Sequence, residues 1–223
     1  MKRFIKKYKN KIFYSQFLKP NNLCFDIGAN IGRKSRFFLS LNTKVIAFEP
    51  QTACHKYLTK IKNKNFQFHS FGVGAKDEIK ELKIANHIEV ATFSDKMIDF
   101  YTTENLKWNK TEKVTVKKID TLIEEFGLPD FCKIDTEGFE FEILSNLSYT
   151  IPVIEFEFAE AFIEETVALI LILEKENTLF NYNLNEKPKF ELKKWVTAKE
   201  MTHILKKIPK NRLHGNIFVK NEK

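Results

Sequence analysis

The chain has 223 residues, of which 43% are hydrophobic and 30% charged, so it is long enough for one large domain and too apolar to be disordered as a whole. Seven glycines and six prolines exclude a collagen-like or low-complexity chain, and three cysteines without metal-ligand spacing exclude a disulfide scaffold and a structural zinc site. The net charge of +8 is compatible with nucleic acid, an anionic membrane surface or an anionic substrate as partner, and also with lysines that only keep the surface soluble.

The first element expected along the chain is a basic amphipathic helix. Apolar residues recur at helical spacing between residues 2 and 18, at Ile5, Tyr8, Ile12 and Phe13. We therefore treat residues 1–20 as an N-terminal helix and residues 21–223 as the main domain. Three roles fit this helix: a cover over the sheet, a contact with an anionic membrane surface, or nucleic-acid binding. Nucleic acid is not expected as the partner, because the chain has no recognition motif.

From residue 23 onwards, short buried strands alternate with helices. Strands are expected at residues 23–27, 44–49, 65–71, 79–85, 113–119, 131–135, 153–158 and 216–220. Helices are expected at residues 33–41, 52–61, 120–126, 138–147, 161–176 and 198–207, and residues 86–112 are expected to be irregular. This alternation indicates an α/β protein whose mostly parallel sheet has helices on both faces. Such sheets bind ligands beyond the carboxyl ends of their strands, so the residues there are the first candidates for a site.

The first strand ends in an acid and a glycine turn, Asp26-Ile27-Gly28-Ala29-Asn30-Ile31-Gly32. Glycines let the backbone turn tightly and approach a ligand closely. Their spacing is GxxxG, whereas dinucleotide-binding proteins have GxGxxG. Asp26 would repel a pyrophosphate but suits a ligand with an ammonium, a sulfonium and no phosphate, which is S-adenosylmethionine. We therefore expect this cofactor to bind at Asp26, Gly28, Asn30 and Gly32.

The second strand also ends in an acid, in the sequence Phe48-Glu49-Pro50. Glu49 follows Gly28 by about 20 residues, the distance at which an acid binds the ribose in dinucleotide-binding folds. A carboxylate there can accept hydrogen bonds from both ribose hydroxyls. Glu49 and Pro50 therefore join the predicted cofactor site.

More carboxylates gather after the two following buried strands. Asp135 and Glu137 follow one strand, while Glu155 and Glu157 share a face of the next because strand side chains alternate. Clustered carboxylates raise a pKa or recruit a cation. Asp135, Glu137 and Glu157 are therefore the candidates for removing a proton, and Asp135 and Glu157 for holding a divalent cation. His87, in the irregular stretch, is a further catalytic candidate.

Four segments, in order and at compatible distances, resemble the FkbM-type methyltransferase family. They are residues 25–32 (FDIGANIG), 47–50 (AFEP), 133–140 (KIDTEGFE) and 152–157 (PVIEFE). The resemblance covers about residues 21 to 160 and implies a class I, Rossmann-like methyltransferase fold with a mostly parallel seven-stranded sheet. It also implies S-adenosylmethionine as cofactor and methyl transfer to a hydroxyl of a sugar, glycan or other small metabolite, as in polysaccharide biosynthesis.

Two other functions are compatible with these residues. One is a Rossmann enzyme that uses NAD(P) or a nucleotide sugar, although the GxxxG spacing and Asp26 count against it. The other is a methyltransferase-like module that binds without catalysis. Intact Asp26, Gly28, Glu49 and Asp135 count against such a loss of activity.

The expected location is the cytoplasm. The odd number of cysteines and the apolar surroundings of Cys24 and Cys132 indicate reduced thiols. No stretch reaches the roughly 20 apolar residues that span a bilayer, and the N-terminus lacks the apolar core of a secretory signal. The N-terminal helix is then expected to make at most a weak peripheral contact with a membrane.

Overall fold

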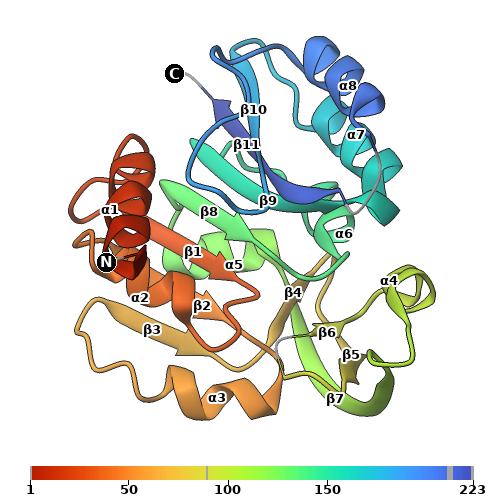
Figure 1. The fold of residues 1–223 in the computed structure, drawn as a ribbon. Coiled ribbons are helices and arrows are strands. Elements are labelled where there is room, and N and C mark those ends of the chain that lie inside the picture. The colour runs from red at the N-terminus through yellow and green to blue at the C-terminus, as the bar shows by residue number, and fades with distance from the viewer. Residues whose placement is uncertain (1, 89, 210–212, 222–223) are drawn as a thin grey trace.

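A seven-stranded sheet forms the centre of the molecule (Figure 1), with strand order β10-β11-β9-β8-β1-β2-β3. The computed structural model describes residues 2–88, 90–209 and 213–221, without the side chains of residues 2–7. The strands are β1 (Leu23–Ile27), β2 (Lys44–Phe48), β3 (Phe66–His69), β8 (Phe131–Ile134), β9 (Val153–Ala159), β10 (Thr178–Leu184) and β11 (His214–Asn221). All neighbours pair in parallel except β11, which is antiparallel to β9 and β10. The predicted mostly parallel sheet is confirmed.

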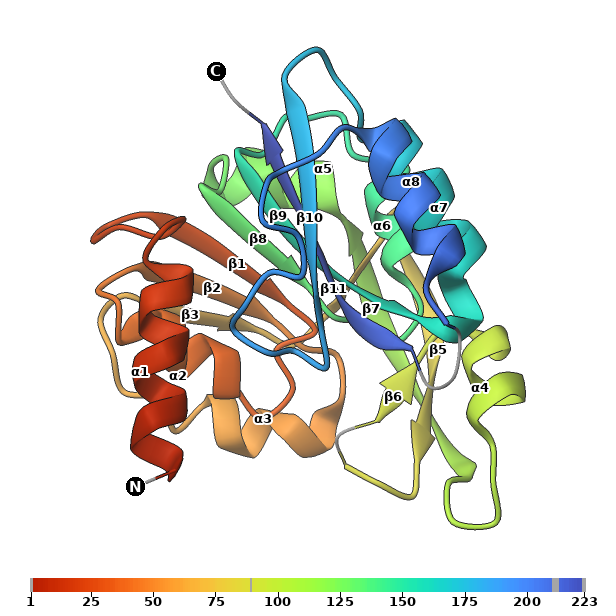
Figure 2. The same cartoon turned by 45° about the horizontal axis from the view of Figure 1, so that its top comes forward.

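Helices cover both faces of this sheet (Figure 2). One face carries α1 (Lys2–Tyr14), α2 (Arg33–Leu39) and α3 (Thr52–Leu58). The other carries α5 (Ile119–Phe126), α6 (Glu140–Leu144), α7 (Ile163–Ile172) and α8 (Ala198–Lys207). Alternate residues of a strand point to opposite faces, so Cys24 packs toward the first group of helices and Phe25 toward the second. In the described part of the chain, no helix is long and apolar enough to cross a membrane.

A second sheet lies beside the carboxyl ends of the central strands, and the sequence analysis missed it. Its strands are β4 (Gly72–Gly74), β5 (Glu78–Ala85), β6 (Ala91–Thr92) and β7 (Trp108–Lys118), in the order β4-β7-β5-β6. The prediction that residues 86–112 are irregular was therefore wrong in part. They contain β6, the start of β7 and the helix α4 (Asp95–Tyr101), which Ser94 caps by accepting a hydrogen bond from the Met97 amide. Strand β7 begins early because it pairs with the distant β5, which local sequence does not reveal.

The C-terminal half of α1 belongs to the core. Phe13 and Tyr14, with Leu18 just after the helix, are buried. The Phe13 ring lies edge-on to Phe218 of β11 with centroids 5.4 Å apart. The predicted boundary after residue 20 would therefore separate α1 from the core against which it packs. This packing supports the role of the helix as a cover over the sheet. Met1 and the side chains of residues 2–7, which carry much of the helix's predicted positive charge, lie outside the described residues.

Neighbouring residues of α1 offer a direct test of this packing. Phe13→Ala should lower the free energy of unfolding by about 3 to 5 kcal/mol, because it leaves a cavity between the helix and the sheet. Ile12→Ala is the matched control, since Ile12 is 59% exposed whereas Phe13 is 6% exposed. Its effect should stay within about 0.5 kcal/mol. Urea denaturation measures both, and equal effects would show that α1 does not pack as described.

Candidate active site

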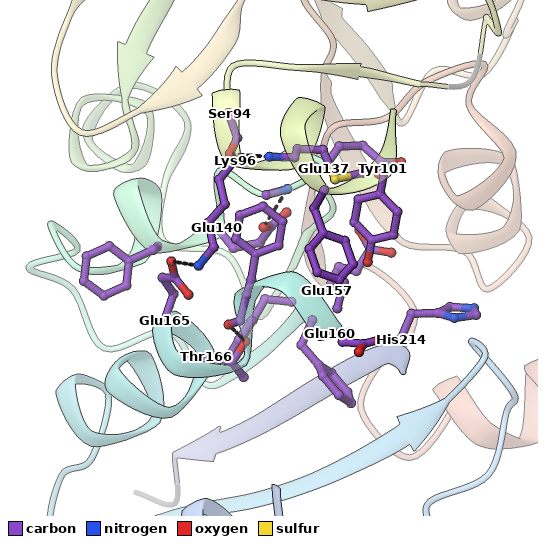
Figure 3. A pocket seen from close by; sticks show the side chains of 18 of the residues that line it. Ser94, Lys96, Tyr101, Glu137, Glu140, Glu157, Glu160, Glu165, Thr166 and His214 are labelled. Carbon is purple, nitrogen blue, oxygen red and sulfur yellow. Dashed lines mark hydrogen bonds and ion pairs between the residues drawn. The ribbon is translucent and has the colours of Figure 1, made fainter. Parts of the chain in front are cut away.

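Two cavities meet at the carboxyl ends of the central strands. The smaller has a volume of about 90 Å³ and lies between the turns after β1, β2 and β8 and the second sheet. The larger has a volume of about 720 Å³ and is enclosed by residues of α4, α6, β9 and α7 (Figure 3). Asp135 lines the smaller cavity and Glu157 the larger one, while Glu137 lines both. The three carboxylates expected to act on a proton therefore stand where the cavities join.

The turn after β1 packs directly against the end of β8. Gly28 has φ +76°, and a Cβ there would lie 1.8 Å from the carbonyl oxygen of Asp135. Only glycine fits such a position, because another residue would be strained by φ and would collide with backbone. Asn30 continues the turn with φ 51° and donates its amide to Glu49. The glycine turn thus places the predicted cofactor residues next to the predicted catalytic ones.

Glu49 joins the first two turns of the site. Its side chain is buried, and its two oxygens accept hydrogen bonds from the amides of Asn30 at 2.7 Å and Gln51 at 2.8 Å. Burial raises the pKa of the Glu49 carboxyl to about 7 despite these hydrogen bonds. The predicted residues Gly28, Asn30, Glu49 and Pro50 all line the smaller cavity. Asp26 and Gly32 are not among the described residues that line it.

Asp26 instead belongs to a buried charged row beneath the site. Asp26 on β1, Lys133 on β8 and Glu155 on β9 are register neighbours across three strands, and each is at most 2% exposed. Ser35 donates to Asp26 at 2.5 Å, and the Lys133 ammonium donates to Asp135 at 2.5 Å. Burial raises the pKa of the Asp26 carboxyl, although Lys133 opposes this shift. Asp26 therefore lies beneath the site, where it neighbours Lys133 and does not line the cavity.

The turn after β8 holds Glu137 in a strained conformation. Its φ is 55°, which is uncommon outside glycine, and Gly138 follows with φ 93°. Thr92 donates to the Glu137 carbonyl at 2.7 Å, and Glu140 accepts from the amides of Thr136 at 2.7 Å and Gly138 at 3.1 Å. Sequence reasoning missed Thr92 and Glu140. Thr92 comes from the unpredicted second sheet, while the acid in the first turn of α6 was the one available signal for Glu140.

The three carboxylates differ in charge although they lie close together. One oxygen of each of Asp135, Glu137 and Glu157 lies within 4.8 Å of the others. The Lys133 ammonium holds the pKa of Asp135 below its ordinary value in spite of burial. Burial, followed by the charge of Asp135, raises the pKa of Glu137 to about 8 and that of Glu157 well above its ordinary value. Asp135 thus carries the negative charge, Glu137 holds a proton near neutral pH, and Glu157 binds its proton more tightly than an ordinary glutamate.

His87 lies apart from this group. It is exposed in the connection between β5 and β6 and is not among the described residues that line either cavity. The structure therefore brings Asp135, Glu137 and Glu157 together and leaves His87 outside.

Comparison with known proteins points to one family and one fold. The model of the methyltransferase FkbM domain matches residues 26–184. The chain is similar to precorrin-6y C5,15-methyltransferase from Geobacter metallireducens GS-15, with 12% identity, a TM-score of 0.51 and coverage of 96% of this chain and 87% of that one. It is also similar to the plantazolicin methyltransferase BpumL in complex with SAH, with 12% identity, a TM-score of 0.50 and coverage of 99% and 84%. No curated protein matches its sequence. These structures confirm the class I methyltransferase fold.

The raised pKa of Glu137 predicts how stability varies with pH. The folded state binds this proton more tightly than the unfolded state, whose carboxyl has an ordinary pKa near 4.5. The resulting stabilisation is fully present below about pH 4.5 and is lost as the pH rises through about 8. The free energy of unfolding should therefore fall less steeply between these pH values in Glu137→Gln than in the wild-type protein. Chemical denaturation across this range measures the slope, and Glu142→Gln, at an exposed position, is the control that should leave it unchanged.

Proposed function

Because the chain belongs to the FkbM methyltransferase family, it is an S-adenosylmethionine-dependent methyltransferase, and we propose that it methylates a hydroxyl of a sugar, glycan or other small metabolite. One observation carries this proposal: Glu137 faces both the smaller cavity and the larger one. A residue at that junction can touch the acceptor hydroxyl beside the transferable methyl group. The larger cavity, at about 720 Å³, has the volume of a small-molecule site, which supports a sugar-sized acceptor. We propose polysaccharide biosynthesis as the setting of this methylation.

The residues of the smaller cavity fit the cofactor. Glu49 retains accepting lone pairs on both oxygens after its two backbone hydrogen bonds, which suits the neighbouring hydroxyls of a ribose. The apolar side chains of Leu82 on β5 and of Phe93, just after β6, form a wall suited to a flat base. The volume of about 90 Å³ is below that of typical ligand sites, so we expect this wall to move outward when the cofactor binds.

Glu137 is the proton acceptor that we propose. Bound S-adenosylmethionine supplies an electrophilic methyl group on a sulfonium. As the acceptor oxygen bonds to the methyl carbon and the carbon–sulfur bond breaks, Glu137 takes the hydroxyl proton. A pKa of about 8 makes its carboxylate a stronger base than an ordinary one, and the charge of Asp135 helps to set this value. Asp135, paired with Lys133, would then help to set the pKa of Glu137 and would not itself serve as the base.

A divalent cation offers a second route to the same step. Asp135 and Glu157, the ligands first expected, lie close enough together with Glu137 to coordinate one. The Lys133 ammonium already places a positive charge against Asp135. We therefore propose direct proton transfer to Glu137. Adding a chelator distinguishes this scheme from the cation-assisted one, because a chelator would stop only a cation-dependent reaction.

Glu49 provides a test of cofactor binding. Glu49→Ala should weaken the binding of S-adenosylhomocysteine by about 1.5 to 3 kcal/mol through loss of a charge-assisted hydrogen-bond pair. Glu112→Ala is the matched control, because Glu112 also accepts a backbone amide, that of Thr52, but does not line the cavity. Isothermal calorimetry measures both affinities. Unchanged affinity in Glu49→Ala, in a protein that melts normally, would place the cofactor elsewhere.

Glu137 and Asp135 provide a test of catalysis. Glu137→Gln should lower turnover by roughly 10²-fold or more and abolish the increase in rate as the pH rises through about 8. Asp135→Asn should move that increase to lower pH, because it removes the neighbouring negative charge. Release of S-adenosylhomocysteine between pH 6 and 9, with a mixture of sugars as acceptors, measures both effects. Wild-type turnover in Glu137→Gln would shift the role to Glu157.

A further inference from the structure

The charge of this chain is divided unevenly along its length. Residues 1–69, which end with β3, contain fifteen lysines and arginines but two acids, so they carry a net charge of +13. The remaining residues therefore carry a net charge of −5, because the whole chain carries +8. The two acids of the first segment, Asp26 and Glu49, are both buried. The surface that this segment contributes is thus strongly basic.

The three helices of this segment lie on one face of the central sheet. Figure 2 shows α1, α2 and α3 on the same side of the strands, and the surface that they form is called the basic face below. Each helix contributes exposed basic side chains, which are Lys9 and Lys11 on α1, Arg33 on α2 and Lys56 on α3. Charge of one sign gathered on one face draws that face toward an anionic surface. The net acidic remainder of the chain favours the same orientation, because it is repelled.

Helix α1 also exposes apolar side chains on the side that faces away from the sheet. Phe13 is buried against the sheet, whereas Tyr8 is 61% exposed and Ile12 is 59% exposed. Tyr8 and Ile12 are four residues apart, so they are neighbours on the helix surface. By helical spacing, the exposed Lys9 and Lys11 stand on either side of this pair. An apolar stripe between lysines is typical of a helix that lies in the interface of a membrane.

This combination favours a lipid surface over nucleic acid. Nucleic-acid affinity comes mainly from contacts between basic side chains and phosphates, and such contacts give no reason to expose Ile12. A bilayer accommodates both kinds of side chain. Its anionic headgroups attract lysines, its acyl boundary takes up an aliphatic side chain, and tyrosine is enriched at the level of the headgroups.

We propose that the basic face docks this protein on an anionic lipid bilayer, with Tyr8 and Ile12 inserted at the headgroup boundary and the lysines of α1 at the lipid phosphates. Helix α1 then serves on both sides, since its inner side packs on β11 through Phe13 and its outer side contacts lipid. Tyr8, Lys9, Lys11 and Ile12 are not among the described residues that line either cavity. Docking is therefore independent of the proposed function, and a test of one leaves the other unaffected.

Flotation of the full-length protein with lipid vesicles tests the docking. Vesicles of equal parts phosphatidylglycerol and phosphatidylcholine should bind the protein, pure phosphatidylcholine should not, and high salt should weaken the binding. Lys9→Glu combined with Lys11→Glu should weaken it at least about 10-fold. The matched control is Lys110→Glu combined with Lys113→Glu, which changes the net charge equally at exposed positions of β7 and should retain binding. Equal losses in the two double variants would show a response to net charge alone and overturn the proposal.

The apolar contact is tested in the same assay. Tyr8→Ala combined with Ile12→Ala should weaken vesicle binding at least about 5-fold, because it removes apolar area from the interface. Ile79→Ala is the control, since Ile79 is 74% exposed on β5, outside the basic face, and should leave binding unchanged. A mobility shift with single-stranded RNA is measured beside it. Binding to RNA without binding to anionic vesicles, no binding to either, or vesicle binding that is unchanged in the Tyr8 and Ile12 variant would each overturn the proposal.

Discussion

The buried ammonium of Lys133 is the interaction on which the site depends. Lys133 is 2% exposed at the centre of the sheet, between Asp26 on one neighbouring strand and Glu155 on the other. A buried charge costs several kcal/mol unless opposite charges compensate it, so these three strands must keep the register that places the charges side by side. A shift of β8 by one residue would turn Lys133 into the apolar cluster on the opposite face. The same ammonium keeps Asp135 ionised, and that charge helps to raise the pKa of Glu137.

The charged row also connects the site to the first helices. Tyr14 of α1 donates to Glu155 at 2.9 Å, and Lys34 of α2 donates to the Tyr14 hydroxyl at 2.9 Å. Glu155 therefore has neighbours from the sheet and from both helices. Helix α1, predicted as an element apart from the main domain, contributes a hydrogen bond to the network beneath the strands that carry the candidate carboxylates, as well as the packing of Phe13. Its placement thus matters for the charge of the site in addition to the stability of the fold.

The second sheet and α4 complete the site from outside the central sheet. Phe93 closes the smaller cavity, Thr92 fixes the Glu137 backbone, and Lys96 and Tyr101 form the outer wall of the larger cavity. All four residues come from the segment that was expected to be irregular. The central sheet thus supplies the candidate carboxylates, while this segment supplies walls that give the larger cavity its shape and part of its aromatic lining.

The sequence alone determined what depends on neighbouring residues in the chain. The buried strands predicted the parallel sheet, and the residues that follow them, Gly28, Glu49 and Asp135, predicted the edge where the site lies and the family. These predictions were possible because each motif is contiguous with its strand. Tertiary structure decided what depends on partners far apart in the chain. It placed Lys133 between Asp26 and Glu155, joined Thr92 to Glu137 and aligned β5 with β7. Which carboxylate holds a proton depends first on burial, which the tertiary packing decides, and then on nearby charges, and not on residue type.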